Sequence, residues 1–377
     1  MKVHETPEER CPVCSADPPH VYQYENSDEY LRKKIPHILE QRKEAGLHGL
    51  VGGLESVIIN TEPETQKATV AEVLQLTGLE FEGAFEDSEY TTAVLKRDGP
   101  DFLIRSRKKK KNNPFTEFNV FPKSTHLPNT RLETFVFATK DIEKYVSIQK
   151  LRGVHFLGDI IHTDTYSFVQ TVPSLYTGNS LGFIEWKKKG DYISGYTLLD
   201  WQIEKPDTDY LQNIRELDHC ATRVKAQERD AAIIEFMELT NYTFDFAIYV
   251  KVFNSITNVA RLSKSDYAMV FTSGIAPYIS DTESGPTERF IHNYGTRVHH
   301  MAFNTDNIED TFAALVEDGM GFLIELVGSP DEGLKQTFTE ASANTLLVNE
   351  YIHRYGDFDG FFTKSNVTLL TGATAKQ

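Results

Sequence analysis

The chain contains few cysteines and no long apolar run. Cys11, Cys14 and Cys220 are the three cysteines among 377 residues, too few for a disulfide framework. A reducing, cytoplasmic environment is therefore expected. No segment reaches the roughly 18–20 consecutive apolar residues of a membrane helix. The opening residues MKVHETPEER also lack the apolar stretch of a signal peptide. Neither membrane insertion nor secretion is expected.

Positive charge is also scarce. The chain has 39 Lys and Arg against 55 Asp and Glu, a formal net charge of −16. Nucleic acids and anionic membranes are bound by basic faces, so neither is an expected partner. The one basic run, Lys108–Lys111, precedes two asparagines and a proline and is interpreted as a solvated loop.

The cysteine pair Cys11–Cys14 has the CxxC spacing of a zinc knuckle. A structural zinc needs four ligands, and the sequence has no second CxxC. Two free thiols are the favoured interpretation, and a zinc site completed by His20 and His37 stays open.

The chain repeats its pattern four times. Segments that begin near Gly53, Thr130, Arg215 and Thr296 each open with a short apolar strand, continue into a helix-like stretch and then run through further strands. The predicted unit is βαβββ. The predicted fold class is α+β, with four such modules in two pairs, each pair a curled mixed sheet with helices outside.

The repeat divides the chain into four parts. Residues 1–50 are predicted to be a helical extension, in which Pro36 is expected to interrupt the helix. Residues 51–190 form the N-terminal pair of modules, and residues 191–214, which include Pro206, form a linker. Residues 215–377 form the C-terminal pair, which we expect to be catalytic and to end in a helix.

The second and fourth segments match almost letter by letter. TRLETFVFATKDIE (130–143) aligns with TRVHHMAFNTDNIE (296–309), which places Glu133 under His299 and Thr134 under His300. Farther along, Gln170 is matched with Gln336 and Glu185 with Glu350.

Comparison of the copies isolates three residues of the C-terminal pair. His219, His300 and Glu350 stand where the N-terminal pair has Ser56, Thr134 and Glu185. Two imidazoles and a carboxylate with open positions are typical of non-heme Fe(II) oxygenases. The N-terminal pair is predicted to be metal-free, because serine and threonine are poor ligands. By strand alternation, His299 should face away from the metal unless a bulge brings it round.

The C-terminal half resembles 4-hydroxyphenylpyruvate dioxygenase and its relatives in the vicinal-oxygen-chelate superfamily. The resemblance lies in LDHC around His219, VHHMAF around His300, LKQTFT around Gln336 and NEYIHR around Glu350. It implies that the two histidines and Glu350 hold Fe(II), and that a 2-oxo acid is oxidised by O₂ with loss of CO₂. It further implies a homo-oligomer, and a substrate pocket that contains the residues Gln336, Phe338 and Phe361 and, if it reaches that far, His299.

The sequence also departs from that family. His299 stands where glutamine is usual, Ala260 and Ile275 stand at positions that are usually polar, and Val367 replaces an aromatic residue. The reaction class is therefore expected to carry over better than the substrate. Two alternatives stay open. One is a redox-free lyase, isomerase or dehydratase using Mn, Mg, Zn or Co, and the other is a small-molecule binding protein.

Overall fold

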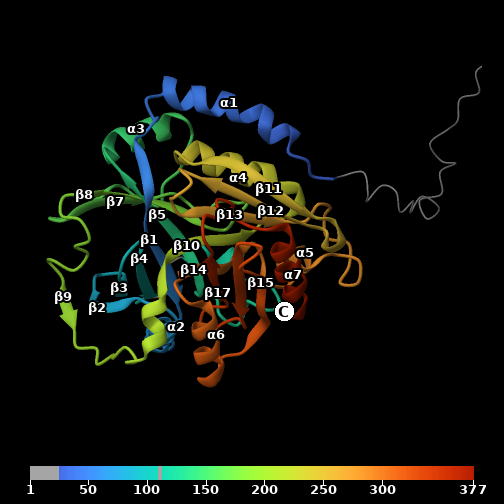
Figure 1. The fold of residues 1–377 in the computed structure, drawn as a ribbon. Helices are drawn as coiled ribbons and strands as arrows, with labels where there is room; N and C mark the ends of the chain where they lie inside the picture. Colours follow the sequence, from blue (N-terminus) through green and yellow to red (C-terminus); the bar gives the residue numbers. More distant parts are fainter. Residues whose placement is uncertain (1–24, 109–112) are drawn as a thin grey trace, which may run out of the picture.

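The computed structural model describes residues 25–108 and 113–377, so Cys11, Cys14 and most of the basic run lie outside the described residues. Two curled sheets occupy the centre of the molecule, and helices lie around them (Figure 1). The first sheet has nine strands in the order β6-β7-β8-β5-β1-β4-β3-β2-β9, and the second has eight in the order β11-β12-β13-β10-β14-β17-β16-β15. Both contain parallel and antiparallel pairs, which confirms the predicted fold class.

Each module has the predicted βαβββ order. The first comprises β1 (Val51–Thr61), α2 (Gln66–Leu76), β2 (Glu80–Glu86), β3 (Tyr90–Lys96) and β4 (Asp101–Arg107). The second comprises β5 (Arg131–Thr139), α3 (Ile142–Leu151), β6 (Ile161–His162), β7 (Tyr166–Gln170) and β8 (Ser180–Trp186). The third comprises β10 (Ile214–Arg223), α4 (Arg229–Leu239), β11 (Thr243–Val250), β12 (Ser255–Arg261) and β13 (Ala268–Ser273). The fourth comprises β14 (Arg297–Thr305), α6 (Ile308–Glu317), β15 (Phe322–Ser329), β16 (Leu334–Thr339) and β17 (Val348–Arg354).

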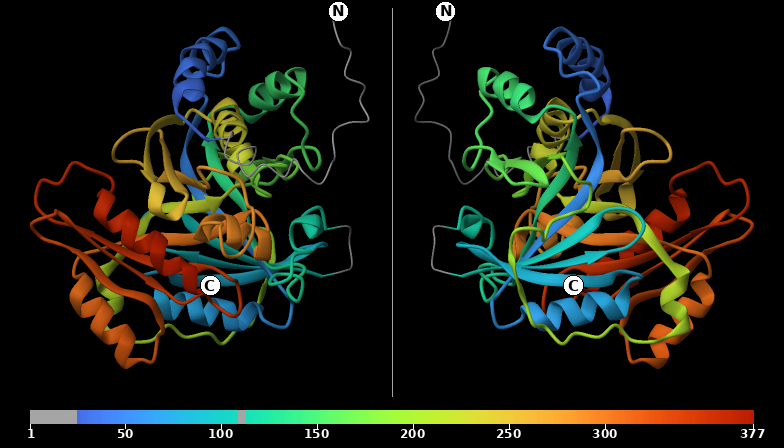
Figure 2. Two further views of the ribbon diagram at one scale, coloured as in Figure 1. Left: turned by 90° about the vertical axis from the view of Figure 1, so that its right-hand side faces the viewer. Right: turned by 90° about the vertical axis from the view of Figure 1, so that its left-hand side faces the viewer.

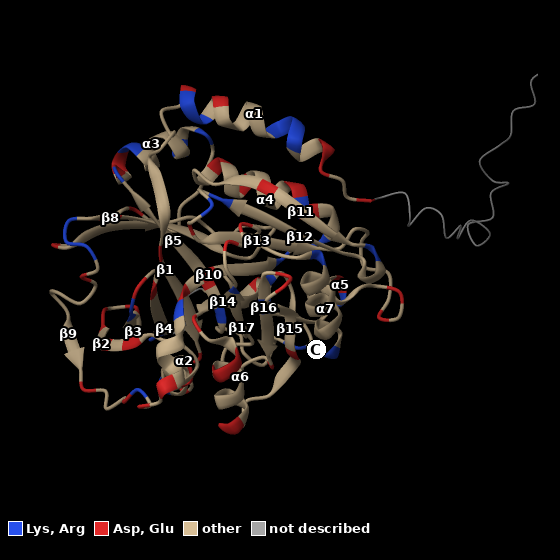
Figure 3. Ribbon diagram, in the orientation of Figure 1, with Lys and Arg blue, Asp and Glu red and all other residues tan. Residues whose placement is uncertain are grey.

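Four further elements lie outside the modules. These are α1 (Glu29–Glu44), β9 (Thr197–Leu199), α5 (Pro286–Tyr294) and α7 (Lys364–Ala373). Helix α1 runs without a break through Pro36, so the expected interruption is wrong. Lys and Arg alternate with Asp and Glu along α1 (Figure 3). Strand β9 lies within the segment expected to be a linker and pairs with β2 at the edge of the first sheet.

The repeated sequence folds for the same local reasons in both halves. Asp141 caps α3 by accepting a hydrogen bond from the Lys144 amide, and Asn307 caps α6 by accepting one from the Asp310 amide. A side-chain oxygen at this position satisfies an amide that the helix itself leaves unpaired. The aligned stretches ATKDIE and NTDNIE therefore begin equivalent helices.

The two sheets pack through their outer faces. Phe102 of β4 stacks on Phe303 of β14 with ring centroids 6.0 Å apart. Phe137 of β5 meets Phe236 of α4 edge to face at 5.8 Å. These side chains belong to one large buried apolar cluster that extends from α1 to β17. Burial of this common core joins the two halves.

The inner faces of the two sheets are filled differently. In the first sheet, Tyr192 from the chain after β8 packs with Ile58, Leu103 and Val136. In the second sheet, α7 lies across the curl and contacts the two edge strands β11 and β15 (Figure 2). Among the described residues, no helix is long and apolar enough to cross a bilayer.

A reciprocal arginine contact joins the halves. The Arg131 guanidinium donates to the Thr296 carbonyl at 3.0 Å, and the Arg297 guanidinium donates to the Thr130 carbonyl at 2.8 Å. Both side chains are almost fully buried. The matched Thr-Arg pairs of the repeat thus face each other across a pseudo-two-fold axis.

We predict that Arg131→Met and Arg297→Met each lower the free energy of unfolding by about 1–3 kcal/mol, because each leaves buried carbonyls unpaired. Urea denaturation followed by circular dichroism measures the change. Arg32→Met is the control, since the Arg32 side chain is 62% exposed. Equal stability of all three variants would contradict the assigned role of the contact.

Candidate metal site

His219, His300 and Glu350 converge on the inner face of the second sheet. They lie on the adjacent strands β10, β14 and β17, and one ligand atom from each lies within 4.8 Å of the others. The Nε2 atoms of both histidines are 3.2 Å from Glu350 Oε2. All three residues are buried. Two imidazoles and a carboxylate in this arrangement can hold a metal ion.

Strand register explains the convergence. Antiparallel pairing sets Ala221 opposite His300 and His219 opposite Ala302. Parallel pairing then sets Ala302 opposite Glu350. Paired residues on neighbouring strands direct their side chains to the same face. The three ligand candidates therefore meet although up to 131 positions separate them along the chain.

Asp218 and Arg354 orient His219. The His219 Nδ1 atom lies 2.7 Å from Asp218 Oδ2, and Arg354 holds the same carboxylate through contacts of 2.6 and 3.1 Å. Burial alone would raise the pKa of Asp218, but Arg354 and His219 outweigh burial and lower it. Asp218 is thus an ionised acceptor for Nδ1–H, and Nε2 is directed to the metal position.

The charge of the site attracts a cation. Burial disfavours protonated His219, but Glu350 and Asp218 outweigh burial and raise the pKa of His219 to about 9. Arg354 balances only one of the two carboxylates. A metal ion can supply the positive charge that the His219 proton otherwise provides. The donor set therefore fits a divalent metal.

A β-bulge brings His299 to the same side as His300. The register of β14 against β10 shifts after the Ala221–His300 pair, so that Thr222 faces Val298 and His299 is the extra residue. The two Nδ1 atoms lie 2.8 Å apart, and His299 Nε2 lies 2.7 Å from the Gln377 side-chain oxygen. Since that oxygen accepts, His299 carries its proton on Nε2 and accepts at Nδ1. His300 then donates from Nδ1 and keeps the Nε2 lone pair.

Both residues of this pair stay neutral. Burial lowers the pKa of His299 well below its ordinary value, and Arg223 adds to the effect. Burial also lowers the pKa of His300, with a further contribution from His299. A neutral His300 is the form that binds metal.

Gln336 contacts the ligand set itself. Its amide nitrogen donates to Glu350 Oε1, and its amide oxygen accepts from Asn366 of α7 at 3.0 Å. Sequence reasoning assigned Gln336 to the substrate. Gln336 also lines the cavity, so its contact with the substrate stays a prediction. In addition, it is an orienting partner of Glu350 and links the ligand set to α7.

A cavity of about 50 Å³ is lined by His300 and Glu350 of the ligand set. Phe338 lines it, as predicted, with its ring centroid 4.8 Å from that of His300. Phe361 packs on the His219 ring at 5.5 Å, while Phe362 lines the cavity. Sequence reasoning missed Phe362.

Ala260 and Ile275, two of the departures from the family, do not line this cavity. Ala260 and Ile275 are buried elsewhere, and the strands β12 and β13 present Ser255, Thr257 and Thr272 instead. These three hydroxyl groups give the cavity a polar wall. Arg223, which the sequence reasoning did not consider, also lines the cavity. Alternation along β10 would have identified it, because it lies four residues after His219.

The N-terminal half was aligned with an error of two to three residues after β5. Gly182 pairs with both Val136 and Gln170, as Glu350 pairs with both Ala302 and Phe338. The counterpart of Glu350 is therefore Gly182 and not Glu185. Glu185 instead accepts from the Ile142 amide at the start of α3.

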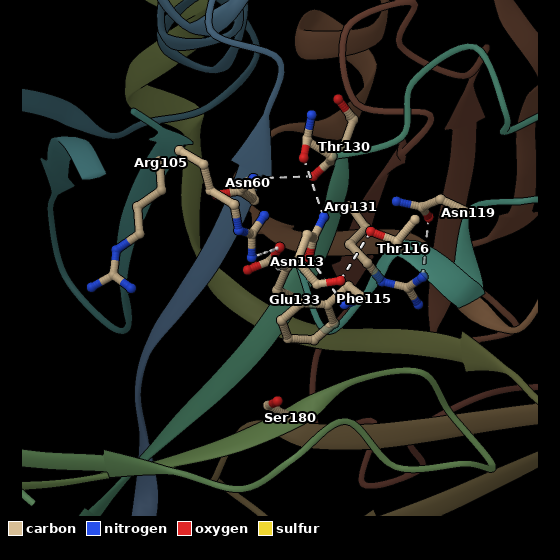
Figure 4. Close-up of polar contacts among 12 residues, drawn as sticks. Asn60, Arg105, Asn113, Phe115, Thr116, Asn119, Thr130, Arg131, Glu133 and Ser180 are labelled. Atoms are coloured by element: carbon tan, nitrogen blue, oxygen red, sulfur yellow. Dashed lines mark hydrogen bonds and ion pairs between the residues drawn. The ribbon is translucent and has the colours of Figure 1, made fainter. Parts of the chain in front are cut away.

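In the first sheet, other polar side chains lie near the positions that correspond to the three candidate ligands. Glu133, the counterpart of His299, forms a buried ion pair of 2.6 Å with Arg107 (Figure 4). Arg131 turns toward Asn119 in the same region. Ser56 and Thr134 are both buried in the first sheet, and Ser56 interacts with the Tyr192 hydroxyl. That this half binds no metal stays a prediction.

Comparison with known proteins identifies solved structures that share this fold. No family model matches the chain, and no curated protein matches its sequence. A mutant of 4-hydroxymandelate synthase from Streptomyces coelicolor superposes with a TM-score of 0.64 at 14% identity, over 86% of this chain and 98% of that one. A fusion of a xylose isomerase-like TIM barrel with 4-hydroxyphenylpyruvate dioxygenase superposes with a TM-score of 0.60 at 14% identity. The match covers 89% of this chain and 56% of the fusion.

The chain has the vicinal-oxygen-chelate fold. At 14% identity the likeness establishes the architecture, and the reaction has to be argued from the residues of the site.

We predict that Asp218→Asn weakens metal binding about 10–100-fold, because the Nδ1–H of His219 loses its charged acceptor. Titration of the metal-free protein with Zn²⁺ against a competing chelator measures the affinity. Asp245→Asn is the matched control, since Asp245 pairs with Arg261 at the surface, away from the cavity. Equal affinity of both variants would show that Asp218 does not support the ligand.

Proposed function

We propose that this protein is an Fe(II)-dependent dioxygenase that oxidises a 2-oxo acid with O₂ and loss of CO₂. The observation that carries the proposal is the convergence of two imidazole Nε2 atoms and one carboxylate oxygen beside a buried cavity. Three protein ligands on one side leave the other positions of an octahedral ion free for substrate and O₂. Bound Fe(II) would supply the site where both molecules meet and the electrons that activate O₂.

The surrounding residues have separate tasks in this proposal. Asp218 and Gln336 orient His219 and Glu350, which fixes the direction of the ligand atoms. Phe338 and Phe362 exclude water from the cavity. Exclusion of water protects a reactive centre from side reactions. Holding the 2-oxo acid and O₂ side by side makes the reaction intramolecular.

The structural neighbours support this choice of reaction class. One neighbour is named for 4-hydroxymandelate synthase, and the other contains a 4-hydroxyphenylpyruvate dioxygenase part. Both share the arrangement of paired modules with this chain. The likeness favours a dioxygenase over the redox-free lyase and over a binding protein, while the residues of the cavity decide which acid fits.

Metal analysis after anaerobic purification tests the proposal. We predict about one Fe(II) per chain in the wild type and almost none in Glu350→Ala, because one of the three ligands is lost. Glu185→Ala is the matched control, since it removes a half-buried strand carboxylate outside the site. Consumption of O₂ should then depend on an added 2-oxo acid and be lost in Glu350→Ala.

Other results would point elsewhere. Stoichiometric zinc, manganese, magnesium or cobalt, with turnover that continues without O₂, would favour the redox-free lyase. Absence of any bound metal in the wild type would overturn the proposal, as would equal metal content in Glu350→Ala.

A further inference from the structure

Arg223 shares the cavity with the ligand set. It lies at the end of β10, four residues after His219 and on the same face of the strand. At a rise of about 3.3 Å per residue, the two Cα atoms are roughly 13 Å apart. The cavity thus has a metal end near His219 and a cationic end at Arg223.

This guanidinium has no carboxylate partner among the described residues. It donates a hydrogen bond to the Pro286 carbonyl at 3.3 Å, and the Phe290 ring lies 4.4 Å away. Tyr294 and His299 are also close enough to interact with its charge. By contrast, buried Arg229 forms ion pairs with Asp28 and Asp230.

An unpaired buried cation is costly. Buried Arg131 and Arg297 donate to carbonyl groups between the two halves, whereas Arg223 lines a cavity in which a ligand can supply the counter-charge. Burial lowers the pKa of Arg223 to about 9, which is consistent with a missing anion.

Hydroxyl groups surround the cationic end. Ser255, Thr257, Thr272 and Thr287 all line the cavity. The Thr272 hydroxyl is buried and has no hydrogen-bond partner among the described residues. A hydroxyl can donate to an anion, and a guanidinium can bind both oxygens of a carboxylate. These groups form a built site for one carboxylate.

We propose that the substrate is a 2-oxo acid with a second carboxylate, which Arg223 and Thr272 bind at the end of the cavity away from the metal. The proposal rests on the proposed function for the 2-oxo end of the molecule. The guanidinium of Arg223 carries one positive charge, which one carboxylate neutralises.

Binding of matched acids tests the proposal. The probes are 2-oxoglutarate against 2-oxopentanoate and 2-oxoadipate against 2-oxohexanoate, which differ within each pair only in the second carboxylate. Calorimetric titration of the Mn²⁺-loaded protein under nitrogen measures affinity without turnover. In at least one pair, the dicarboxylate should bind at least about 10-fold tighter, the strength of one charge-assisted contact.

Substitutions at Arg223 and Thr272 test whether these residues cause the preference for the dicarboxylate. We predict that Arg223→Met abolishes the preference and that Arg223→Lys keeps part of it, because lysine retains the charge but not the paired donors. Thr272→Val should reduce the preference about 3–10-fold without changing side-chain volume. Thr222→Val is the matched control, since the Thr222 hydroxyl is also buried and unpaired in the described structure but does not line the cavity.

The outcomes separate this inference from the proposed function. Equal binding within both pairs, a preference that survives in Arg223→Met, or tighter binding of 4-hydroxyphenylpyruvate than of either dicarboxylate would overturn it. An Arg223-dependent preference without O₂ consumption would uphold the carboxylate site and reject the dioxygenase. If Arg223→Met does not fold, an unchanged preference in Thr272→Val would count against the site.

Discussion

The antiparallel pairing of β10 with β14 is the constraint on which the rest of the site depends. These strands open the third and fourth modules, and their pairing joins two separate repeats into one sheet. It sets His219 and His300 on neighbouring strands, and the parallel pairing of β14 with β17 then adds Glu350. Because every backbone group in the centre of a sheet needs its partner, the register cannot slip without loss of buried hydrogen bonds.

The bulge in β14 belongs to the fold rather than to the metal site. The register of β1 against β5 shifts at the equivalent place, and the extra residue there is Glu133. One backbone device thus directs an additional polar side chain inward in each half. In the first half that side chain pairs with Arg107, and in the second His299 hydrogen-bonds to His300. The same geometry carries an ion pair in one copy and a histidine pair in the other.

The two halves show how one architecture is adapted to two roles. Aromatic residues at the end of β8 and after it fill the inner face of the first sheet, with the rings of Trp186 and Tyr192 4.9 Å apart. The inner face of the second sheet is covered by α7, which leaves a small polar cavity beside the ligand candidates. Gly182 marks the difference, since a Cβ there would come within about 3 Å of Phe168 and Val136 side chains. There is no room for a carboxylate at this position.

The sequence alone determined the repeat, the module order, the pairing of modules and the three candidate ligands. Hydrophobic alternation and the near-identity of two segments carry that information locally. Strand register, the bulge and the contacts of α7 were decided only in the tertiary structure, because they depend on partners distant in the chain. For this reason the sequence matched Glu185 with Glu350 and did not reveal Arg223 or the contact between Gln336 and Glu350. Side-chain chemistry was readable residue by residue, whereas the distances between those residues arise from the pairing of whole strands.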